Sequence, residues 1–196
     1  MKKILLIHDV FSSINDIFIK DFIGNLRKYL IIVPELPTQP AETMRMLKAI
    51  CKEENPDLVV GWNSGGFFAQ QLSDYERVLI SPEYDISVIF NSILKGKNGV
   101  DFPYIVPRSS GEERFDITPA LVKSYAEMEA RQFSNISRSK KMVHSFFWFG
   151  HNERNLKTHQ EHYHDVTFLP GKDYSDPKST KAICSYVQFL LDNPEI

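Results

Sequence analysis

The stretch DLVVGWNSGGFFAQQL, from Asp57 to Leu72, decides the fold of this chain. An apolar run leads into a glycine-rich corner, and a segment typical of a helix follows at once. A strand, a tight glycine turn and a helix form the junction where many α/β proteins hold a phosphate group or a nucleophile. The residues at the corner therefore have to be compared with each kind of site.

Two kinds of site do not fit the corner. The dinucleotide fingerprint needs glycine at its first, third and sixth positions, and the third position counted from Gly61 is Asn63. The phosphate loop needs Lys and then Ser or Thr after its second glycine. Gly61 and Gly66 have the required spacing, but Phe67 and Phe68 follow. The lysine that would reach the phosphates is therefore missing.

The nucleophile elbow, G-x-S-x-G, fits in its frame but not at its apex. Gly61 and Gly65 stand two residues either side of Asn63, where the reactive serine belongs. Ser64 comes one position late. Asparagine tolerates a positive φ better than most residues, so it suits the strained apex without supplying a hydroxyl group. The sequence predicts the shape of an elbow without its usual nucleophile.

The composition indicates one globular domain of 196 residues with a net charge of −2. No basic excess favours nucleic acid or an anionic membrane as a partner. Cys51 and Cys184 lie far apart in helix-like segments and are interpreted as buried thiols. The apolar run Ile4–Ile7 is too short for a secretory signal. We expect a cytoplasmic protein.

Strand-like and helix-like segments alternate along the chain, which predicts a parallel sheet covered on both faces. The expected strands are 3–7, 31–33, 57–60, 77–80, 141–150 and 166–169. The expected helices include one from the elbow to about Ser73, a short one at 86–94, a polar helix or turn at 153–162, and two that begin at the caps Thr118 and Asp176. Sites in such sheets lie at the carboxyl ends of the strands. The residues that we expect near one another there are His8, Asp9, Asn63, Ser64, Ser81, Glu153 and Lys172.

The elbow and two further stretches carry a resemblance to a known family. PDLVVGWNSGGFFAQQL is the closest part, and LISPEY and ALVKSYAEM agree as well. The chain resembles the small bacterial esterases of the YqiA/YcfP type over nearly its whole length. The resemblance implies an α/β-hydrolase fold, with a mostly parallel sheet between helices. It also implies one domain, residues 1–196, with a covering segment at about 83–135.

The positions that match the family's triad are substituted. Asn63 stands where the family has its nucleophilic serine. The acid turn corresponds to residues 150–153, so Glu153 is the candidate acid. The catalytic histidine would lie near Lys172, in FLPGKDY, which contains no histidine. Asn63, Glu153 and Lys172 are therefore the degenerate triad positions that the resemblance implies.

The turn after the first strand also departs from the family in a way that disfavours catalysis. The His-Gly-Phe type turn corresponds here to His8, Asp9, Val10 and Phe11. A carboxylate at Asp9 would oppose the negative charge that develops on an oxyanion. The predicted pocket and oxyanion region comprises His8, Asp9, Val10, Phe11, Trp62, Ser64, Ser81 and His151.

Three functional hypotheses follow. The leading one is a diverged, catalytically impaired relative of esterases that keeps a pocket for a small ligand or a partner protein, with no cofactor and no resident metal. The alternative is a carboxylic-ester or thioester hydrolase that uses Ser64, Glu153 and a relocated histidine. The third is a metal site in HQEHYHD, residues 159–165, although a solvated polar segment accounts for this pattern better.

Overall fold

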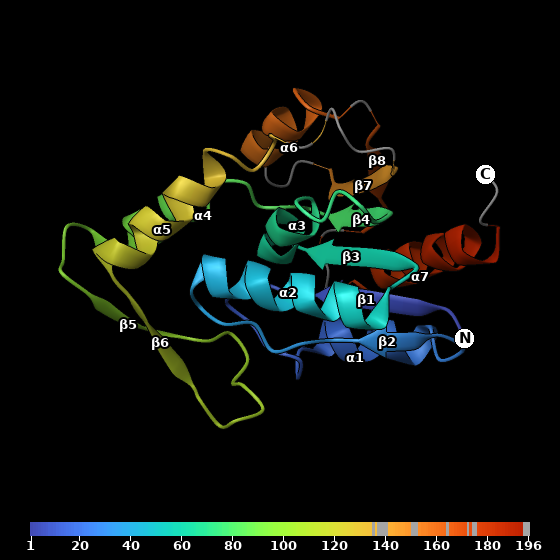
Figure 1. Ribbon diagram of the computed structural model, residues 1–196, viewed down its shortest axis with the longest axis horizontal. Coiled ribbons are helices and arrows are strands. Elements are labelled where there is room, and N and C mark those ends of the chain that lie inside the picture. The colour runs from blue at the N-terminus through green and yellow to red at the C-terminus, as the bar shows by residue number, and fades with distance from the viewer. Residues whose placement is uncertain are drawn as a thin grey trace.

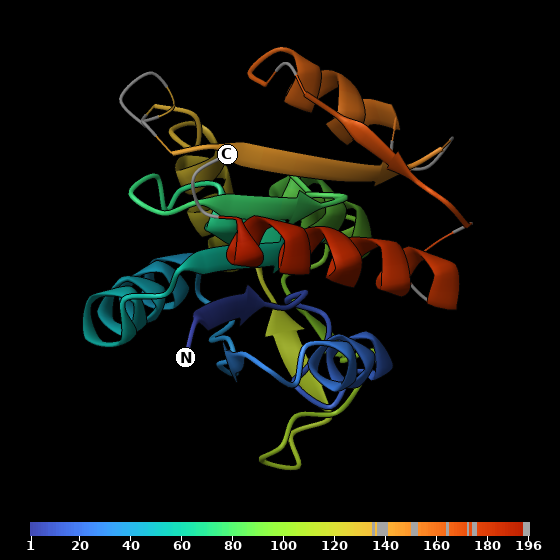
Figure 2. The same cartoon turned by 90° about the vertical axis from the view of Figure 1, so that its right-hand side faces the viewer.

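The computed structural model describes residues 1–134, 136, 141–149, 153–163, 165–171, 173 and 176–193. Six parallel strands form its main sheet, in the order β2-β1-β3-β4-β7-β8. The strands are β1 (Lys3–Ile7), β2 (Leu30–Ile32), β3 (Leu58–Trp62), β4 (Arg77–Ile80), β7 (Val143–Trp148) and β8 (Thr167–Leu169). Figure 2 shows them running in one direction, with the amino terminus of the chain at the edge where the strands begin.

The pairing of the central strands places their last residues side by side. Ile7 of β1 pairs with Gly61 of β3, and Trp62 of β3 pairs with Ile80 of β4. His8, Asn63 and Ser81 therefore follow neighbouring strands at one edge of the sheet. The register thus brings the predicted site residues of three separate loops to the same place.

Helices cover both faces of the sheet because the central strands β1, β3 and β4 are buried on both sides (Figure 1). One face packs against α1 (Ile17–Asn25) and α7 (Pro177–Asp192). The other packs against α2 (Pro40–Glu54) and α3 (Ser64–Ala69). The core is accordingly divided by the sheet into two apolar clusters.

A long excursion separates β4 from β7. It comprises α4 (Ile86–Leu94), the antiparallel hairpin of β5 (Val100–Pro103) and β6 (Arg114–Ile117), and α5 (Pro119–Glu129). Figure 1 shows this excursion on the side toward which β3 points. It follows that the excursion stands beyond the carboxyl ends of the strands, where sites of this architecture lie.

Several local predictions are confirmed and a few are wrong. Thr118 and Asp176 cap α5 and α7 through their side chains, as expected of these residue types. The helix after the elbow ends at Ala69 rather than near Ser73. The hairpin within the excursion was not expected, because Gly and Pro around it mask the short alternation of its strands. The remaining helix, α6 (Glu153–Gln160), begins where the polar helix was predicted.

In the part of the chain that the structure describes, no helix combines the length and the apolar character needed to cross a bilayer.

Candidate functional site

Asn63 occupies the apex of a true elbow. Its φ of 49° and ψ of −120° lie in the region that non-glycine residues rarely adopt. Its N–H donates to the Ile80 carbonyl at 3.0 Å, and its carbonyl accepts from the N–H groups of Gly66 and Glu83 at 2.9 and 3.0 Å. The strained conformation is thus fixed by bonds to both neighbouring segments.

The glycines around the apex are required by packing. A Cβ at Gly65 would lie 2.0 Å from the Ile7 carbonyl oxygen, and one at Gly61 would lie 2.5 Å from the Ala69 Cβ. Both distances are far shorter than any contact between such atoms. The frame that identifies the elbow in the sequence therefore reflects how closely α3 approaches β1 and β3.

The Asp9 carboxylate binds the two residues at the elbow. The Ser64 hydroxyl donates to Asp9 Oδ1 at 2.7 Å, and the Asn63 amide donates to Asp9 Oδ2 at 3.1 Å. The Phe11 N–H also donates to Asp9 Oδ1, at 3.1 Å. Asp9 is only 7% exposed, so these donors compensate for the burial of its carboxylate.

The Ser64 hydroxyl both accepts and donates a hydrogen bond. It accepts from the Val10 N–H at 2.7 Å while it donates to Asp9. Among the described residues these are its only side-chain partners, and Ser64 is 1% exposed. In an active elbow a backbone N–H of this first turn points at the oxyanion. Here the Val10 N–H is used to hold a side chain.

Aromatic side chains of the excursion pack over the same turn. The Phe11 ring lies 5.3 Å from Phe90 of α4, 5.8 Å from Phe102 of β5 and 6.0 Å from Phe115 of β6. Tyr125 of α5 is fully buried nearby, and burial raises the pKa of its hydroxyl. The space beyond the elbow is therefore packed with rings from four elements of the excursion.

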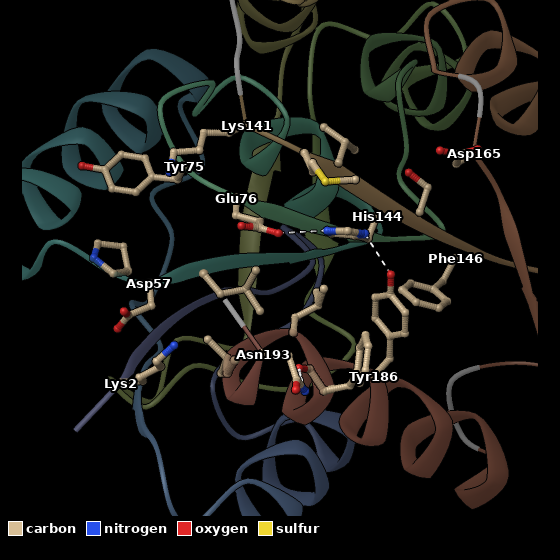
Figure 3. A pocket seen from close by; sticks show the side chains of 18 of the residues that line it. Lys2, Asp57, Tyr75, Glu76, Lys141, His144, Phe146, Asp165, Tyr186 and Asn193 are labelled. Atoms are coloured by element: carbon tan, nitrogen blue, oxygen red, sulfur yellow. Dashed lines mark hydrogen bonds and ion pairs between the residues drawn. The ribbon is translucent and has the colours of Figure 1, made fainter. Parts of the chain in front are cut away.

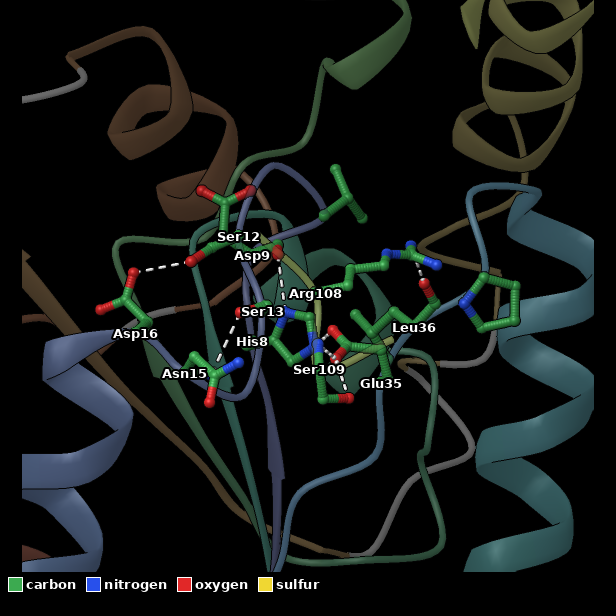
Figure 4. A network of polar contacts seen from close by, with 12 residues as sticks. His8, Asp9, Ser12, Ser13, Asn15, Asp16, Glu35, Leu36, Arg108 and Ser109 are labelled. Carbon is green, nitrogen blue, oxygen red and sulfur yellow. Dashed lines mark hydrogen bonds and ion pairs between the residues drawn. The ribbon is translucent and has the colours of Figure 1, made fainter. Parts of the chain in front are cut away.

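Polar contacts fasten the excursion to the first loop. The Ile105 N–H donates to the Phe11 carbonyl at 2.6 Å, and the Ser13 hydroxyl donates to the Pro107 carbonyl at 2.8 Å. Arg108 donates to the Leu36 carbonyl and lies 4.6 Å from the Tyr104 ring centre. Arg108 is thus built into the structure rather than exposed in a loop, as Figure 4 shows.

His8 lies close to the contacts that hold the excursion against the first loop (Figure 4). Its Nδ1 is 2.7 Å from the Asp9 carbonyl oxygen and its Nε2 is 3.5 Å from Glu35 Oε1 (Figure 4). The side chain is fully buried, and this burial lowers the pKa of its imidazole. Glu35 in turn accepts from Ser109 of the excursion. His8 therefore orients the loop in its neutral form.

The other predicted site residues differ in their surroundings. Trp62 is buried on the α1 face, with its ring 4.7 Å from that of Phe18. Ser81 is buried at a φ of 43°, and its hydroxyl has no partner among the described residues. Glu153 is exposed at the start of α6. His151 and Lys172 lie outside the described residues.

The histidine-rich segment is divided between two environments. His159 is fully buried, with Nδ1 2.7 Å from the Tyr84 hydroxyl, and burial lowers its pKa to about 4. The His162 ring stacks on Phe133 at 3.8 Å between ring centres. His164 lies outside the described residues. The Tyr84 partner was not predicted, because nothing in its sequence neighbourhood marks it as buried.

A groove of about 940 Å³ lies at the opposite edge of the sheet, at the amino ends of the strands (Figure 3). Its walls come from the segments that precede β3, β4, β7 and β8 and from the last turns of α7. His144 lies in it, with Nε2 3.1 Å from Glu76 Oε1 and Nδ1 2.9 Å from the Tyr186 hydroxyl. None of the residues predicted for the elbow site lines this groove.

The strand order, the elbow and the excursion after β4 together define the class of protein. Alpha/beta hydrolase domain-containing protein 10 from mouse is similar, with a TM-score of 0.73, 11% identity, and 98% of this chain and 90% of that chain covered. Est1E from Butyrivibrio proteoclasticus, with ferulic acid bound, is similar with a TM-score of 0.71 and 11% identity, and 98% of this chain and 89% of that chain are covered. The chain therefore has the α/β-hydrolase fold.

A monoacylglycerol lipase from Paleococcus ferrophilus is also similar, with a TM-score of 0.65, 15% identity, and 97% of this chain and 94% of that chain covered. No family model matches the sequence, and no curated protein matches it. At these identities the structural similarity establishes the fold and leaves the activity to be argued from the elbow.

Proposed function

We propose that this chain is a catalytically impaired relative of the small esterases of the YqiA/YcfP type, in which the elbow has become a structural junction. One observation carries the proposal: the Asp9 carboxylate occupies the elbow and accepts from both Asn63 and Ser64. A negative group at this place opposes an oxyanion, and the Val10 N–H is engaged by the Ser64 hydroxyl. The elbow keeps the backbone geometry of a hydrolase, but its polar side chains hydrogen-bond to one another.

The alternative proposal, an ester or thioester hydrolase, requires Ser64 to attack. In this proposal a relocated histidine takes the hydroxyl proton, so its ring nitrogen would have to lie within about 3 Å of the hydroxyl. The partner it has is Asp9, and among the described residues no histidine bonds to Ser64. Glu153, proposed as the acid, is exposed at the start of α6. The contacts of Ser64 thus favour the impaired form over the active one.

The test is labelling with a fluorophosphonate probe, together with turnover of short p-nitrophenyl esters. We expect neither for the wild-type protein, since the apex has no hydroxyl. The matched control is Ser64→Ala, which removes the only hydroxyl in the elbow. Labelling of the wild type that disappears in Ser64→Ala would overturn the proposal and establish the hydrolase.

A second variant examines whether only the chemistry has been lost. Asn63→Ser puts a hydroxyl at the apex, where φ is already 49°. We expect slow labelling at position 63, and more of it when Asp9→Gly also opens the turn. If the double variant folds and stays unlabelled while a reactive serine probe labels a known hydrolase beside it, the elbow has lost more than its nucleophile.

A further inference from the structure

The groove at the amino ends of the strands has the features of a ligand site. Its volume of about 940 Å³ falls within the range of pockets that hold small molecules. It is lined by the segments that lead into four strands and by α7, so several parts of the fold rather than one loop set its shape. It shares no residue with the elbow, so its occupancy does not depend on the elbow.

A carboxylate is held in the groove by a directed chain of hydrogen bonds. Glu76 can only accept, so the His144 Nε2, 3.1 Å from its Oε1, carries the proton. In neutral His144 the Nδ1 then accepts from the Tyr186 hydroxyl at 2.9 Å. Figure 3 shows the three side chains in line. The chain orients the Glu76 carboxylate before any ligand arrives.

The second oxygen of this carboxylate is available. Glu76 is 37% exposed at its side chain, and Oε2 has no partner among the described residues. His144 beside it is 11% exposed, so water reaches the acid and not the base. A donor that enters the groove therefore meets an oriented anionic acceptor.

Apolar and aromatic surface surrounds the acid. The Phe146 and Tyr186 rings meet edge to face at 5.0 Å between centres. Phe189 and Met142, which also line the groove, are 47% and 53% exposed. Aromatic faces attract organic cations, and apolar side chains lose water when a ligand covers them. These walls favour a ligand with a hydrocarbon part.

The remaining charges decide the sign of that ligand. Asp57, Asp74 and Asp165 line the groove in addition to Glu76, against Lys2 and Lys141. Asp57 accepts from the Lys3 N–H at 2.8 Å and is partly engaged. Among the described residues that line the groove, carboxylates outnumber ammonium groups, so their field favours a cation.

We propose that this groove binds a small organic ammonium compound, with the ammonium group on Glu76 and the hydrocarbon part against Tyr186 and Phe189. The ammonium donates to Glu76 Oε2 and leaves the His144 bond to Oε1 in place. An aryl-alkyl amine satisfies both parts of the site. The activity of the elbow has no influence on this binding.

Three ligands of matched shape test the proposal: 2-phenylethylammonium, 2-phenylethanol and 3-phenylpropionate. Calorimetry and amide chemical shifts are recorded for the full chain. We expect the amine to bind at least tenfold more tightly than the alcohol or the acid, with shifts at Glu76, His144 and Tyr186. Equal or tighter binding of the acid, or no shift in the groove with millimolar amine, would overturn the proposal.

Variants locate the binding. Glu76→Gln keeps the shape and removes the charge, and it should weaken amine binding roughly tenfold or more. Glu127→Gln is the control, because Glu127 is an exposed acid on α5 far from the groove lining. Phe189→Ala, at an exposed position, should weaken binding several-fold without affecting the fold. Unchanged amine affinity in Glu76→Gln would contradict the assignment, as would equal losses in Glu127→Gln.

Discussion

The two edges of the sheet treat their polar side chains in opposite ways. At the carboxyl ends, Asp9 and Ser64 are 7% and 1% exposed and bond to each other. At the amino ends, Glu76 is 37% exposed at its side chain and holds one oxygen toward a groove. The fold leads one to expect the site at the first edge. A ligand can therefore bind where polar atoms are exposed and unbonded, whichever edge of the fold they occupy.

The largest effect on stability is expected at the carboxyl-end edge of the sheet, where backbone atoms pack most closely around Gly65. Gly65→Ala places a Cβ 2.0 Å from the Ile7 carbonyl oxygen and should lower the free energy of unfolding by about 3 kcal/mol or more, or prevent folding. Gly24→Ala in α1 is the control: no atom lies within 4 Å, and it should stabilise by about 0.5–1 kcal/mol. Urea unfolding compares them, and similar stabilities would disprove the close packing.

Acid should weaken the packed interior next. The pKa of His159 is lowered from 6.5 to about 4, so between these values the unfolded chain binds a proton that the folded chain does not. Stability is therefore complete above pH 6.5 and falls as the pH drops toward 4, by roughly 3 kcal/mol for this group. Burial lowers the pKa of His8 as well, which adds to the loss in the same direction.

The measurement is urea unfolding at several pH values for the wild type, His159→Phe and His162→Gln. His159→Phe should reduce the dependence between pH 6.5 and 4 and leave only the part due to His8, although it is less stable at pH 7 because Tyr84 loses its partner. His162→Gln should keep the wild-type dependence. A slope as steep in His159→Phe as in the wild type would assign the acid sensitivity elsewhere.

Removing the carboxylate from the packed edge should have an intermediate effect. Asp9→Ala leaves the Ser64 hydroxyl and the Phe11 N–H without their acceptor, so we expect a loss of about 2 kcal/mol. Asp116→Ala, at an exposed position of β6, should stay within about 0.5 kcal/mol of the wild type. Equal stability of the two variants would mean that Asp9 contributes nothing to the junction.

The smallest effect is expected at the amino-end edge of the sheet, beside the groove. Removing one tyrosine hydroxyl at each edge measures the difference in stability. Tyr186→Phe removes a hydroxyl that bonds to His144 beside the groove, where water can replace it, and should cost less than about 1 kcal/mol. Tyr84→Phe removes a buried hydroxyl from His159 and should cost about 1–2 kcal/mol. The reverse order in urea unfolding would contradict the difference between the edges.

Local patterns predicted most of the fold. The strands 3–7 and 77–80 and the helix 86–94 agree with the structure because short apolar runs and helical spacing depend on nearby residues. The elbow was identified from two glycines and an asparagine, whose φ of 49° fits the argument for its tolerance of this conformation. Predicting the arrangement of strands also brought His8, Asp9, Asn63 and Ser64 to one edge.

The contacts at that edge could not be predicted in the same way. The bond between Ser64 and Asp9 joins residues 55 positions apart, and nothing in either neighbourhood specifies it. The same holds for Glu76, His144 and Tyr186, which come from the segment before β4, from β7 and from α7. Each looks like an ordinary surface residue in the sequence, because their meeting depends on the register of parallel strands joined through long connections.

The close approach at Gly65 has a consequence for how such a chain changes over generations. Replacing this glycine is harmful through folding alone, since its missing side chain makes room for the backbone of β1. A change from serine to asparagine at the apex carries no such penalty once hydrolysis is no longer under selection, because asparagine tolerates the positive φ. A lineage that abandons the reaction will therefore discard its serine early and retain its glycines, and the surviving pattern records the ancestry of the backbone rather than its present chemistry.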